Sequence, residues 1–139
     1  MSITVRFGNI KDSNDVVNGD QHVPNHILTW KLQNQEIVLA TDDEDVVGYL
    51  RLEFLWSKYP YIGLIKVHPD YRGQGLGKRL LQFVEEHLKK KGVKAIYSSS
   101  QVNENNPQEW HRKSGFKECG IINGINEGNI GELFFVKEL

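Results

Sequence analysis

The sequence predicts a single α/β domain over residues 1–139, built on a mixed β-sheet. Two observations lead to this fold class. Runs rich in β-branched and aromatic residues, typical of strands, alternate with segments whose apolar residues have helical spacing. A glycine-rich turn also joins a strong strand to the best-defined helix, an arrangement that suits phosphate binding. A chain of 139 residues is long enough to bury one hydrophobic core.

The first part of the chain is expected to form a short strand, a helical region and a hairpin. Residues 4–7 have the composition of a strand. Residues 8–36 are polar, with helical spacing of apolar residues near their end, and turn formers at 18–20 divide them. Residues 37–40 and 46–56 then read as two strands around a charged turn, and therefore as a hairpin.

The rest of the chain contains the clearest helix, over residues 75–91. Its apolar residues fall on one stripe, at Leu76, Leu80, Phe83, Val84 and Leu88. Three lysines occupy its last turn, where cations complement the helix dipole, and Gly92 ends it. The other expected elements are strands over 61–67, 93–98, 116–122 and 131–137, and a short helix over 107–113.

Composition excludes several classes of protein. Charged residues make up 25% and hydrophobic residues 39%, which is ordinary for a soluble domain. We find no signal peptide and no membrane span, so we expect a cytoplasmic protein without a membrane partner. The net charge of -1 does not support nucleic-acid binding. The one cysteine, Cys119, cannot form an internal disulfide, and we expect it to be a small core residue.

The charges are distributed unevenly. Residues 1–45 contain eight Asp or Glu against three Lys or Arg, whereas residues 46–139 contain ten against fourteen. An acidic first part and a basic second part would suit a cationic substrate that meets a polyanionic cofactor. The alternative is that both are merely solvated faces.

The glycine-rich turn is the strongest functional signal. Glycines let the backbone approach an anion, and free N–H groups of a first helical turn point toward it. The ATP-binding P-loop pattern fails, because Arg72 and Arg79 stand at two of its required positions. The dinucleotide pattern fails at Lys78. The turn does match [QR]-x-x-G-x-[GA], with Arg72, Gly75 and Gly77 at the fixed places.

Here the sequence resembles the GNAT family of acetyltransferases. The family hallmark lies in the run Val67-His68-Pro69-Asp70-Tyr71-Arg72-Gly73-Gln74-Gly75-Leu76-Gly77-Lys78. A second segment, Trp110-His111-Arg112-Lys113-Ser114-Gly115-Phe116, looks like the family's aromatic-Tyr-x-Lys-x-Gly-Phe segment. The resemblance covers residues 37–139. It implies the GNAT fold: a mixed, mostly antiparallel sheet flanked by helices, with splayed central strands and a pyrophosphate-binding loop opening the main helix.

The resemblance implies acetyl coenzyme A as a co-substrate and no metal. Its pyrophosphate is expected on backbone amides of the loop, at Arg72, Gly73, Gln74, Gly75, Leu76, Gly77 and Lys78. Its pantetheine arm is expected to pair like an extra strand with Ile65, Lys66 and Val67. An asparagine after the next strand binds pantetheine in the family. The usual register places Glu104 there, and the choice among its neighbours Asn103, Asn105 and Asn106 stays open.

The implied reaction is direct attack of an amine on the thioester. The Val67 N–H corresponds to the family's oxyanion donor. The family's usual acid is a Tyr, and His111 stands in its place. An imidazolium, whose pKa is ordinarily about 6.5, could protonate the leaving thiolate; alternatively, His111 is a surface histidine without a catalytic role.

A general base is harder to assign from the sequence. Tyr61 occupies the strand position where some family members carry a catalytic Glu. Glu53 and Glu132 are alternative bases, and each could equally be an ordinary polar residue on a strand face. A chain of water molecules could serve instead of a dedicated base.

Two functions from different classes therefore stay open. The first is an enzyme that acetylates a primary amine of a small molecule, a peptide or a protein. The second is a non-catalytic sensor or partner module that binds acyl coenzyme A, favoured by the replaced Tyr and the missing strand Glu. The acceptor is unidentified, although acidic residues would favour an amine with extra positive charge. An exposed edge strand would favour a homodimer.

Overall fold

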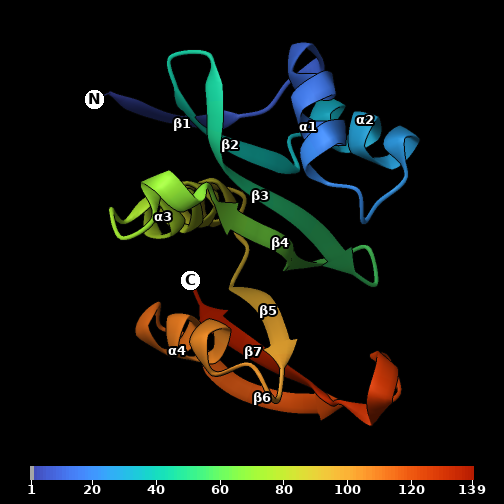
Figure 1. Cartoon of the computed structure of the whole chain (residues 1–139). Helices are drawn as coiled ribbons and strands as arrows, with labels where there is room; N and C mark the ends of the chain where they lie inside the picture. The colour runs from blue at the N-terminus through green and yellow to red at the C-terminus, as the bar shows by residue number, and fades with distance from the viewer. Residues whose placement is uncertain (1) are drawn as a thin grey trace. The chain divides into compact units, whose positions relative to one another are not determined.

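The structure is a computed structural model that describes residues 2–139. Its elements are labelled in Figure 1. In chain order they are β1 (Ile3–Phe7), η1 (Ile10–Asp12), α1 (Ser13–Gly19), α2 (Asn25–Gln33), β2 (Ile37–Asp42), β3 (Asp45–Leu55), β4 (Tyr59–Val67), η2 (Pro69–Tyr71), α3 (Leu76–Lys90), β5 (Ala95–Gln101), α4 (Asn105–Lys113), β6 (Lys117–Ile122), η3 (Glu127–Asn129) and β7 (Glu132–Glu138). The η elements are short 3-10 helices.

The strands follow the order β1-β2-β3-β4-β5-β7-β6. The β4–β5 pair is parallel, whereas the β1–β2, β2–β3, β5–β7 and β6–β7 pairs are antiparallel. The prediction of a mixed, mostly antiparallel sheet in an α/β fold is therefore confirmed. Within residues 2–139, the one matched residue pair between β4 and β5 is Tyr61 with Tyr97. This single pair agrees with the expectation of central strands that splay.

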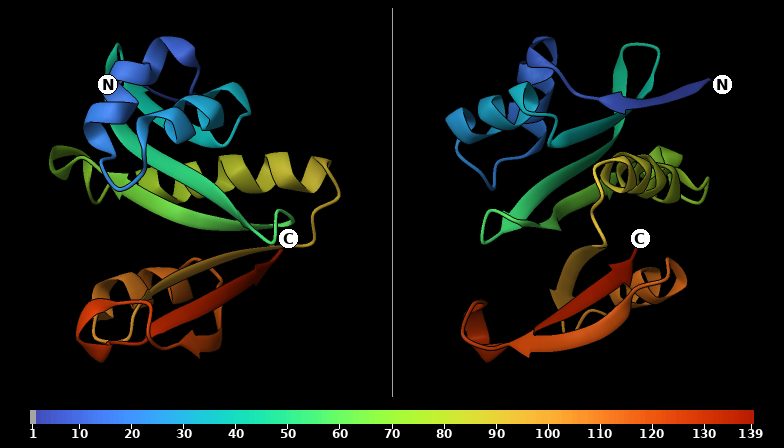
Figure 2. Two further views of the ribbon diagram at one scale, coloured as in Figure 1. Left: turned by 90° about the vertical axis from the view of Figure 1, so that its right-hand side faces the viewer. Right: turned by 180° about the vertical axis from the view of Figure 1, so that it is seen from behind.

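The chain forms two compact units, which we describe separately. Residues 2–52 and 63–86 form the N-terminal unit, and residues 53–62 and 87–139 form the C-terminal unit. In the N-terminal unit, α1 and α2 lie on one side of the strands and α3 on the other (Figures 1 and 2). Within residues 2–139, no helix is long and apolar enough to cross a membrane.

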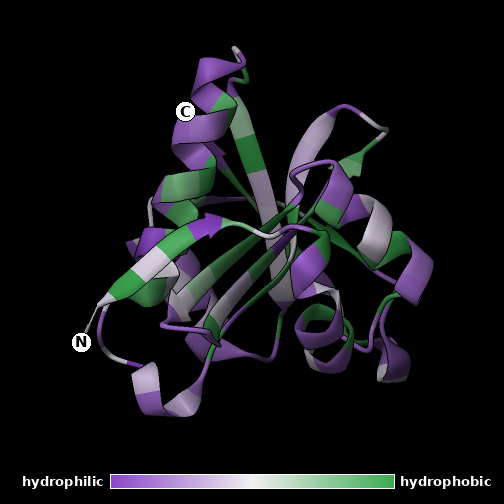
Figure 3. Ribbon diagram, turned by 90° about the horizontal axis from the view of Figure 1, so that it is seen from above, coloured by the Kyte–Doolittle hydropathy of each residue, from purple (hydrophilic) through white to green (hydrophobic). Residues whose placement is uncertain are grey.

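The core of the N-terminal unit follows from strand alternation. Ile37 and Leu39 of β2 point toward α1 and α2, and they share a buried cluster with Leu28 and Leu32. The other face packs on α3, where a Cβ added at Gly48 would lie 3.2 Å from Leu80. Glycine at this position lets α3 approach the sheet closely. In Figure 3 the hydrophobic colour alternates with hydrophilic colour along both the strands and the helices.

A buried polar network holds the α1–α2 connection against β3. Asp20 is fully buried and accepts hydrogen bonds from the Tyr49 hydroxyl and the Arg51 Nε, both at 2.6 Å. Burial alone raises the pKa of the Asp20 carboxyl, but these hydrogen bonds outweigh it and leave the pKa below its ordinary value. The carboxylate therefore stays charged and paired inside the unit.

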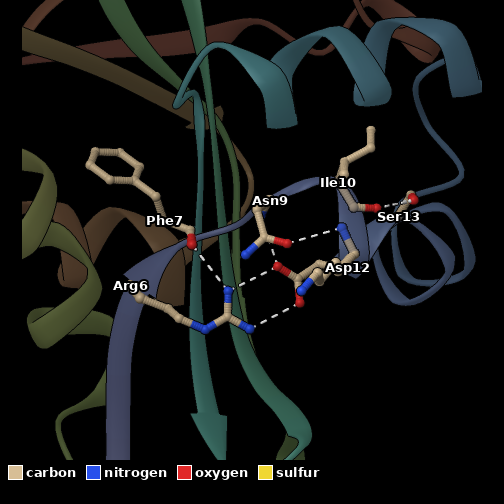
Figure 4. A network of polar contacts seen from close by, with 7 residues as sticks. Arg6, Phe7, Asn9, Ile10, Asp12 and Ser13 are labelled. Carbon is tan, nitrogen blue, oxygen red and sulfur yellow. Dashed lines mark hydrogen bonds and ion pairs between the residues drawn. The ribbon is translucent and has the colours of Figure 1, made fainter.

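A second polar network, at the surface, turns the chain from β1 into η1 (Figure 4). Arg6 donates from its two terminal nitrogens to the two carboxylate oxygens of Asp12, at 2.8 and 2.9 Å. Asp12 also accepts from the Asn9 backbone N–H at 2.8 Å, and the Asn9 side chain accepts from the Lys11 N–H at 2.9 Å. These reciprocal bonds satisfy N–H groups that the first turn leaves unpaired.

The C-terminal unit consists of β5, β7 and β6 with α4 on one face. The pairing of β5 with β7 runs from Ala95–Glu138 to Gln101–Glu132. Strand β6 lies at the edge, and all six of its residues are exposed. Cys119 lies on β6 and is exposed, so the expectation that it is a core residue was wrong. Cys119 is exposed because β6 is an edge strand whose side chains lie outside the core.

Candidate active site

The loop between β4 and α3 leaves its backbone open. Gly73 and Gly75 both have φ of 78°, which L-residues rarely adopt. A Cβ at either position would meet no atom within 4 Å, so there is room for a ligand against the backbone. The first backbone bond of α3 runs from Arg79 N–H to the Gly75 carbonyl at 3.0 Å. The amides of residues 76–78 therefore lie outside the helical ladder, as an anion-binding loop requires.

The side chains of the loop have structural partners. Arg72 donates from Nε to the Val67 carbonyl at 3.1 Å, which closes the loop back on the end of β4. Tyr71 donates to Asp42 at 2.6 Å, and this hydrogen bond raises the pKa of the Tyr71 hydroxyl. Arg79 and Lys78 are both exposed, and Arg79 donates to the Ile3 carbonyl at 3.0 Å. Of these two cations, Lys78 is the better placed to meet a bound phosphate.

The end of β4 directs alternate amides away from β3. The His68 N–H donates to the Val47 carbonyl of β3 at 2.8 Å. Because N–H groups alternate along a strand, the Lys66 N–H lies on the same side, and those of Ile65 and Val67 point to the opposite side. An added extended chain pairs with N–H groups two residues apart, such as those of Ile65 and Val67. The role of the Val67 N–H as oxyanion donor stays a prediction.

A cleft of about 790 Å³ opens beside this end of β4, within the N-terminal unit. Val67, Tyr49 and Lys66 lie in its wall. The Lys66 ammonium donates to the Gly19 carbonyl and lies 5.8 Å from the centre of the Tyr49 ring. Acidic residues outnumber basic ones in the lining, which includes Asp15, Glu44, Asp45 and Asp70 against Lys66 and Arg72. The cleft therefore carries negative charge next to the predicted oxyanion donor.

His111 lies inside the C-terminal unit rather than at its surface. Its side chain is 4% exposed, and its ring stacks on Phe135 with centroids 4.5 Å apart. Its Nε2 lies 2.7 Å from the Ser98 hydroxyl. Burial lowers the pKa of His111 to about 4, so the ring is neutral at pH 7. A neutral imidazole is a poor acid, and these contacts favour a packing role over the predicted acid role.

Tyr61 and Glu132, two candidate catalytic residues, are brought together by a residue that the sequence did not single out. The Tyr61 hydroxyl lies 2.5 Å from the Ser99 hydroxyl, which donates to Glu132 at 2.5 Å. Asn126 donates to the other oxygen of Glu132 at 2.9 Å. Ser99 and Asn126 gave no sequence signal, because serines and loop asparagines are common and only strand register aligns these side chains.

The remaining predicted residues occupy four positions in the C-terminal unit. Asn103 lies in the turn after β5, and Asn106 lies in the first turn of α4; both are exposed. Glu104 is the residue that precedes α4. Glu53 is half-buried on β3. The N-terminal unit thus holds Ile65, Lys66, Val67 and residues 72–78, while the C-terminal unit holds Tyr61, Glu53, Asn103, Asn106 and His111.

Comparison with known proteins gives a family match over most of the chain. The family described as "Acetyltransferase (GNAT) family" matches residues 10–116. An S-alkylcysteine N-acetyltransferase from Bacillus subtilis (strain 168) is 29% identical over 75 residues, 50% of this chain and 42% of that protein. A streptothricin acetyltransferase from Streptomyces lavendulae is 26% identical over 101 residues, 71% of this chain and 53% of that protein. The chain thus spans about half the length of these curated relatives.

Solved structures share the fold. A Bacillus anthracis (strain Ames) protein assigned as a streptothricin acetyltransferase, in complex with acetyl coenzyme A, superposes with a TM-score of 0.81. The match covers 100% of this chain and 99% of that chain at 19% sequence identity. The fold class that the resemblance implied is therefore confirmed.

Proposed function

Because the chain belongs to the acetyltransferase (GNAT) family, we propose that it transfers the acetyl group of acetyl coenzyme A to a primary amine. The observation that carries the proposal is the loop of residues 72–78, which combines two glycines at φ of 78° with open amides before α3. The coenzyme A pyrophosphate rests on these amides. The pantetheine arm pairs with the N–H groups of Ile65 and Val67 on the strand that leads into the loop.

The proposed reaction is direct transfer. The amine nitrogen attacks the thioester carbon, and the Val67 N–H donates to the oxyanion that develops on the carbonyl. As the intermediate collapses, the nitrogen loses one proton to water, the carbon–sulfur bond breaks and coenzyme A leaves as a thiolate, which takes a proton from water. Acetyl coenzyme A supplies the activated acetyl group, and this chain's residues bind it and stabilise the developing charge.

We propose that the acceptor amine carries further positive charge. The acidic wall of the cleft beside Val67 supports this class of substrate, because Asp15, Glu44 and Asp45 would attract cations. The acidic balance of residues 1–45 acts in the same direction. One matched relative is named a streptothricin acetyltransferase and another an S-alkylcysteine N-acetyltransferase. Streptothricin and an S-alkylcysteine therefore serve as test acceptors.

A second candidate function is a sensor module that binds acyl coenzyme A without transferring the acetyl group. The burial of His111, in the place of the usual acid, favours it. The two candidates share the cofactor and differ in turnover with an amine.

Calorimetric titration tests the binding step that both candidates share. We expect acetyl coenzyme A to bind much more tightly than ATP or NAD. Gly75→Val should weaken acetyl coenzyme A binding by about tenfold or more, because a branched side chain would stand where the pyrophosphate meets the backbone.

Gly92→Val is the matched control. Gly92 also has φ of 78° and also has no atom within 4 Å of an added Cβ, but it lies after the far end of α3. The backbone strain is thus alike in both variants, and only Gly75→Val should lose affinity. A Gly75→Val protein that binds as tightly as the wild type, or a preference for ATP or NAD, would refute the assignment of the loop.

A further inference from the structure

The Lys66 side chain places an ammonium group in the cleft of the N-terminal unit. Lys66 is exposed near the end of β4 and lines the cleft, as does Gly19 at the end of α1. Its ammonium donates to the Gly19 carbonyl. The same ammonium lies 5.8 Å from the centre of the Tyr49 ring, a distance at which an aromatic face attracts a cation. The cleft therefore already holds one cation, bound to a carbonyl and a ring.

The carbonyl in this arrangement suits any ammonium group. Helix α1 ends at Gly19, and the last carbonyls of a helix carry partial negative charge without a partner in the helix. The last turn of α1 contains no basic residue of its own. Lys66 therefore supplies, from β4, the cation that this helix end favours.

The aromatic ring in this arrangement is fixed. Tyr49 is 4% exposed, and its hydroxyl donates to the buried Asp20 carboxylate at 2.6 Å. The Arg51 Nε donates to the same carboxylate oxygen at 2.6 Å. Burial and the Asp20 carboxylate raise the pKa of the Tyr49 hydroxyl, so the side chain stays a neutral phenol. The Tyr49 ring is thus held where the Lys66 ammonium meets it.

The Lys66 ammonium is held less firmly than the ring that it contacts. Lysine has a flexible stem, and both partners of its ammonium, the Gly19 carbonyl and the Tyr49 ring, are uncharged. A cation–π contact at an exposed position is weak. An ammonium group of a ligand can therefore take the place of the Lys66 ammonium. Carboxylates in the cleft lining would attract such a ligand: Asp15, Glu44 and Asp45.

We propose that Lys66 occupies the subsite for a second ammonium group of the acceptor, the group that is not acetylated. The proposal rests on the proposed acetyl transfer and narrows the acceptors to diamines and polyamines. Lys66 is then a specificity-determining residue. The second ammonium of the acceptor displaces the Lys66 ammonium from the Gly19 carbonyl and the Tyr49 ring, and the Lys66 side chain turns to solvent.

The position of Lys66 also sets the spacing between the two amines. Lys66 and Val67 are consecutive, and both line the cleft. The subsite thus lies one lysine side chain, a stem of about four carbons, from the backbone where the oxyanion is expected. A diamine with its nitrogens at a similar separation is the simplest probe. 1,4-Diaminobutane meets this requirement, and butylamine, which has the same carbon chain and one ammonium, is its comparator.

The first test measures amine binding without turnover. Calorimetry follows the titration of 1,4-diaminobutane into the protein saturated with coenzyme A, which carries no acetyl group. Lys66→Met keeps a long side chain without the charge. It should bind the diamine about tenfold more tightly than the wild type, because no resident ammonium must be displaced. Lys66→Arg retains a cation and should bind the diamine no more tightly than the wild type.

Lys11→Met is the matched control. Lys11 is also exposed in the N-terminal unit and lies outside the cleft lining, and its replacement changes the net charge by the same amount. Diamine affinity in this variant should equal that of the wild type. A gain in Lys66→Met without one in Lys11→Met assigns the effect to the position of the ammonium rather than to the charge of the whole protein.

Two further readouts place the second ammonium. In the diamine complexes of the wild type and of Lys66→Met, nuclear Overhauser effects should connect the diamine methylenes to the Tyr49 ring. In turnover with acetyl coenzyme A, the ratio of kcat/KM for 1,4-diaminobutane to that for butylamine should rise about tenfold in Lys66→Met. Butylamine has no second ammonium to profit from the vacated subsite.

The outcomes distinguish this inference from the proposed function. The subsite is overturned by equal diamine affinity in the wild type and Lys66→Met, by an equal gain in Lys11→Met, by a bound diamine without contact to Tyr49, or by no measurable diamine binding. None of these results affects acetyl transfer, which thiol release with S-methylcysteine or an alanyl peptide reports. Diamine binding as predicted, in a protein that releases no thiol with any amine, contradicts the proposed function and leaves the ammonium subsite in place.

Discussion

His111 shows how a single buried side chain makes stability depend on pH. The ring is 4% exposed and its pKa is lowered to about 4 by burial, with Arg112 lowering it further and the Pro107 carbonyl and Glu132 raising it. In the unfolded chain the ordinary pKa is about 6.5. The unfolded state therefore binds more protons between these values. The stability that the neutral ring contributes is complete above pH 6.5 and is lost as the pH falls toward 4.

We predict that this loss is absent in His111→Phe, which keeps an aromatic ring against Phe135. Between pH 7 and pH 4.5, the free energy of unfolding of the wild type should fall by about 2 to 3 kcal/mol more than that of the variant. Urea unfolding at both pH values measures this difference. Protonation of carboxylates changes the free energy of unfolding alike in both proteins, because both contain the same carboxylates, so it cancels in the comparison. Equal losses in the two proteins would mean that His111 is protonated or exposed in the folded state.

The site was predictable at the residue scale where it depends on contiguous sequence. The loop of residues 72–77 is a local motif, so its spacing alone distinguished it from the ATP and dinucleotide patterns. The hydrogen-bonded side chains of Tyr61, Ser99 and Glu132 meet only through pairing of β4 with β5 and of β5 with β7. No local pattern encodes that register. For His111 the sequence left a catalytic acid and a surface histidine open, and its burial was not predicted, because burial depends on how its ring packs on Phe135 of β7.

At the element scale, the end of β4 carries the backbone that the proposed function assigns to pantetheine. It directs the Ile65 and Val67 amides away from β3. We predict that acetyl coenzyme A slows hydrogen exchange at the Ile65 and Val67 amides, because pantetheine pairs with them. Exchange at Lys66 and His68 should change little, because these amides lie on the β3 side.

Amide exchange followed by NMR, with and without coenzyme A, measures this alternation. The four amides are close in sequence, so they serve as internal controls for one another. Equal slowing at all four would indicate general stabilisation rather than strand-like pairing. No change at Ile65 and Val67 in a saturated complex would place the pantetheine elsewhere.

Element boundaries departed from the sequence prediction where pairing overrides local composition. Residues 93–98 were expected to form a strand, but β5 runs from Ala95 to Gln101 because β7 pairs with it through the three serines. The strand expected at 61–67 begins at Tyr59 and includes the buried Pro60. The helix α3, whose apolar stripe is local, matches its expected bounds within one residue at each end.

At the scale of the whole molecule, the charge balance and the family point to one kind of chemistry. The chain belongs to the GNAT family and spans about half the length of its curated relatives, which act on different acceptors. Acceptor choice is therefore the property that the fold leaves most open. The acidic cleft of the N-terminal unit is the feature from which we propose a cationic amine.

The central claim is amine-dependent acetyl transfer, and one assay tests it directly. The purified protein is incubated with acetyl coenzyme A and each of four amines: S-methylcysteine, streptothricin, spermidine and an alanyl peptide. Free thiol is followed over time, and the product is identified by mass spectrometry. We predict that thiol release depends on at least one amine and that the product is N-acetylated. Release should be faster with spermidine or streptothricin than with S-methylcysteine, whose side chain is uncharged. Tight binding of acetyl coenzyme A with thiol release no faster in the presence of any amine would contradict the claim and favour the sensor module.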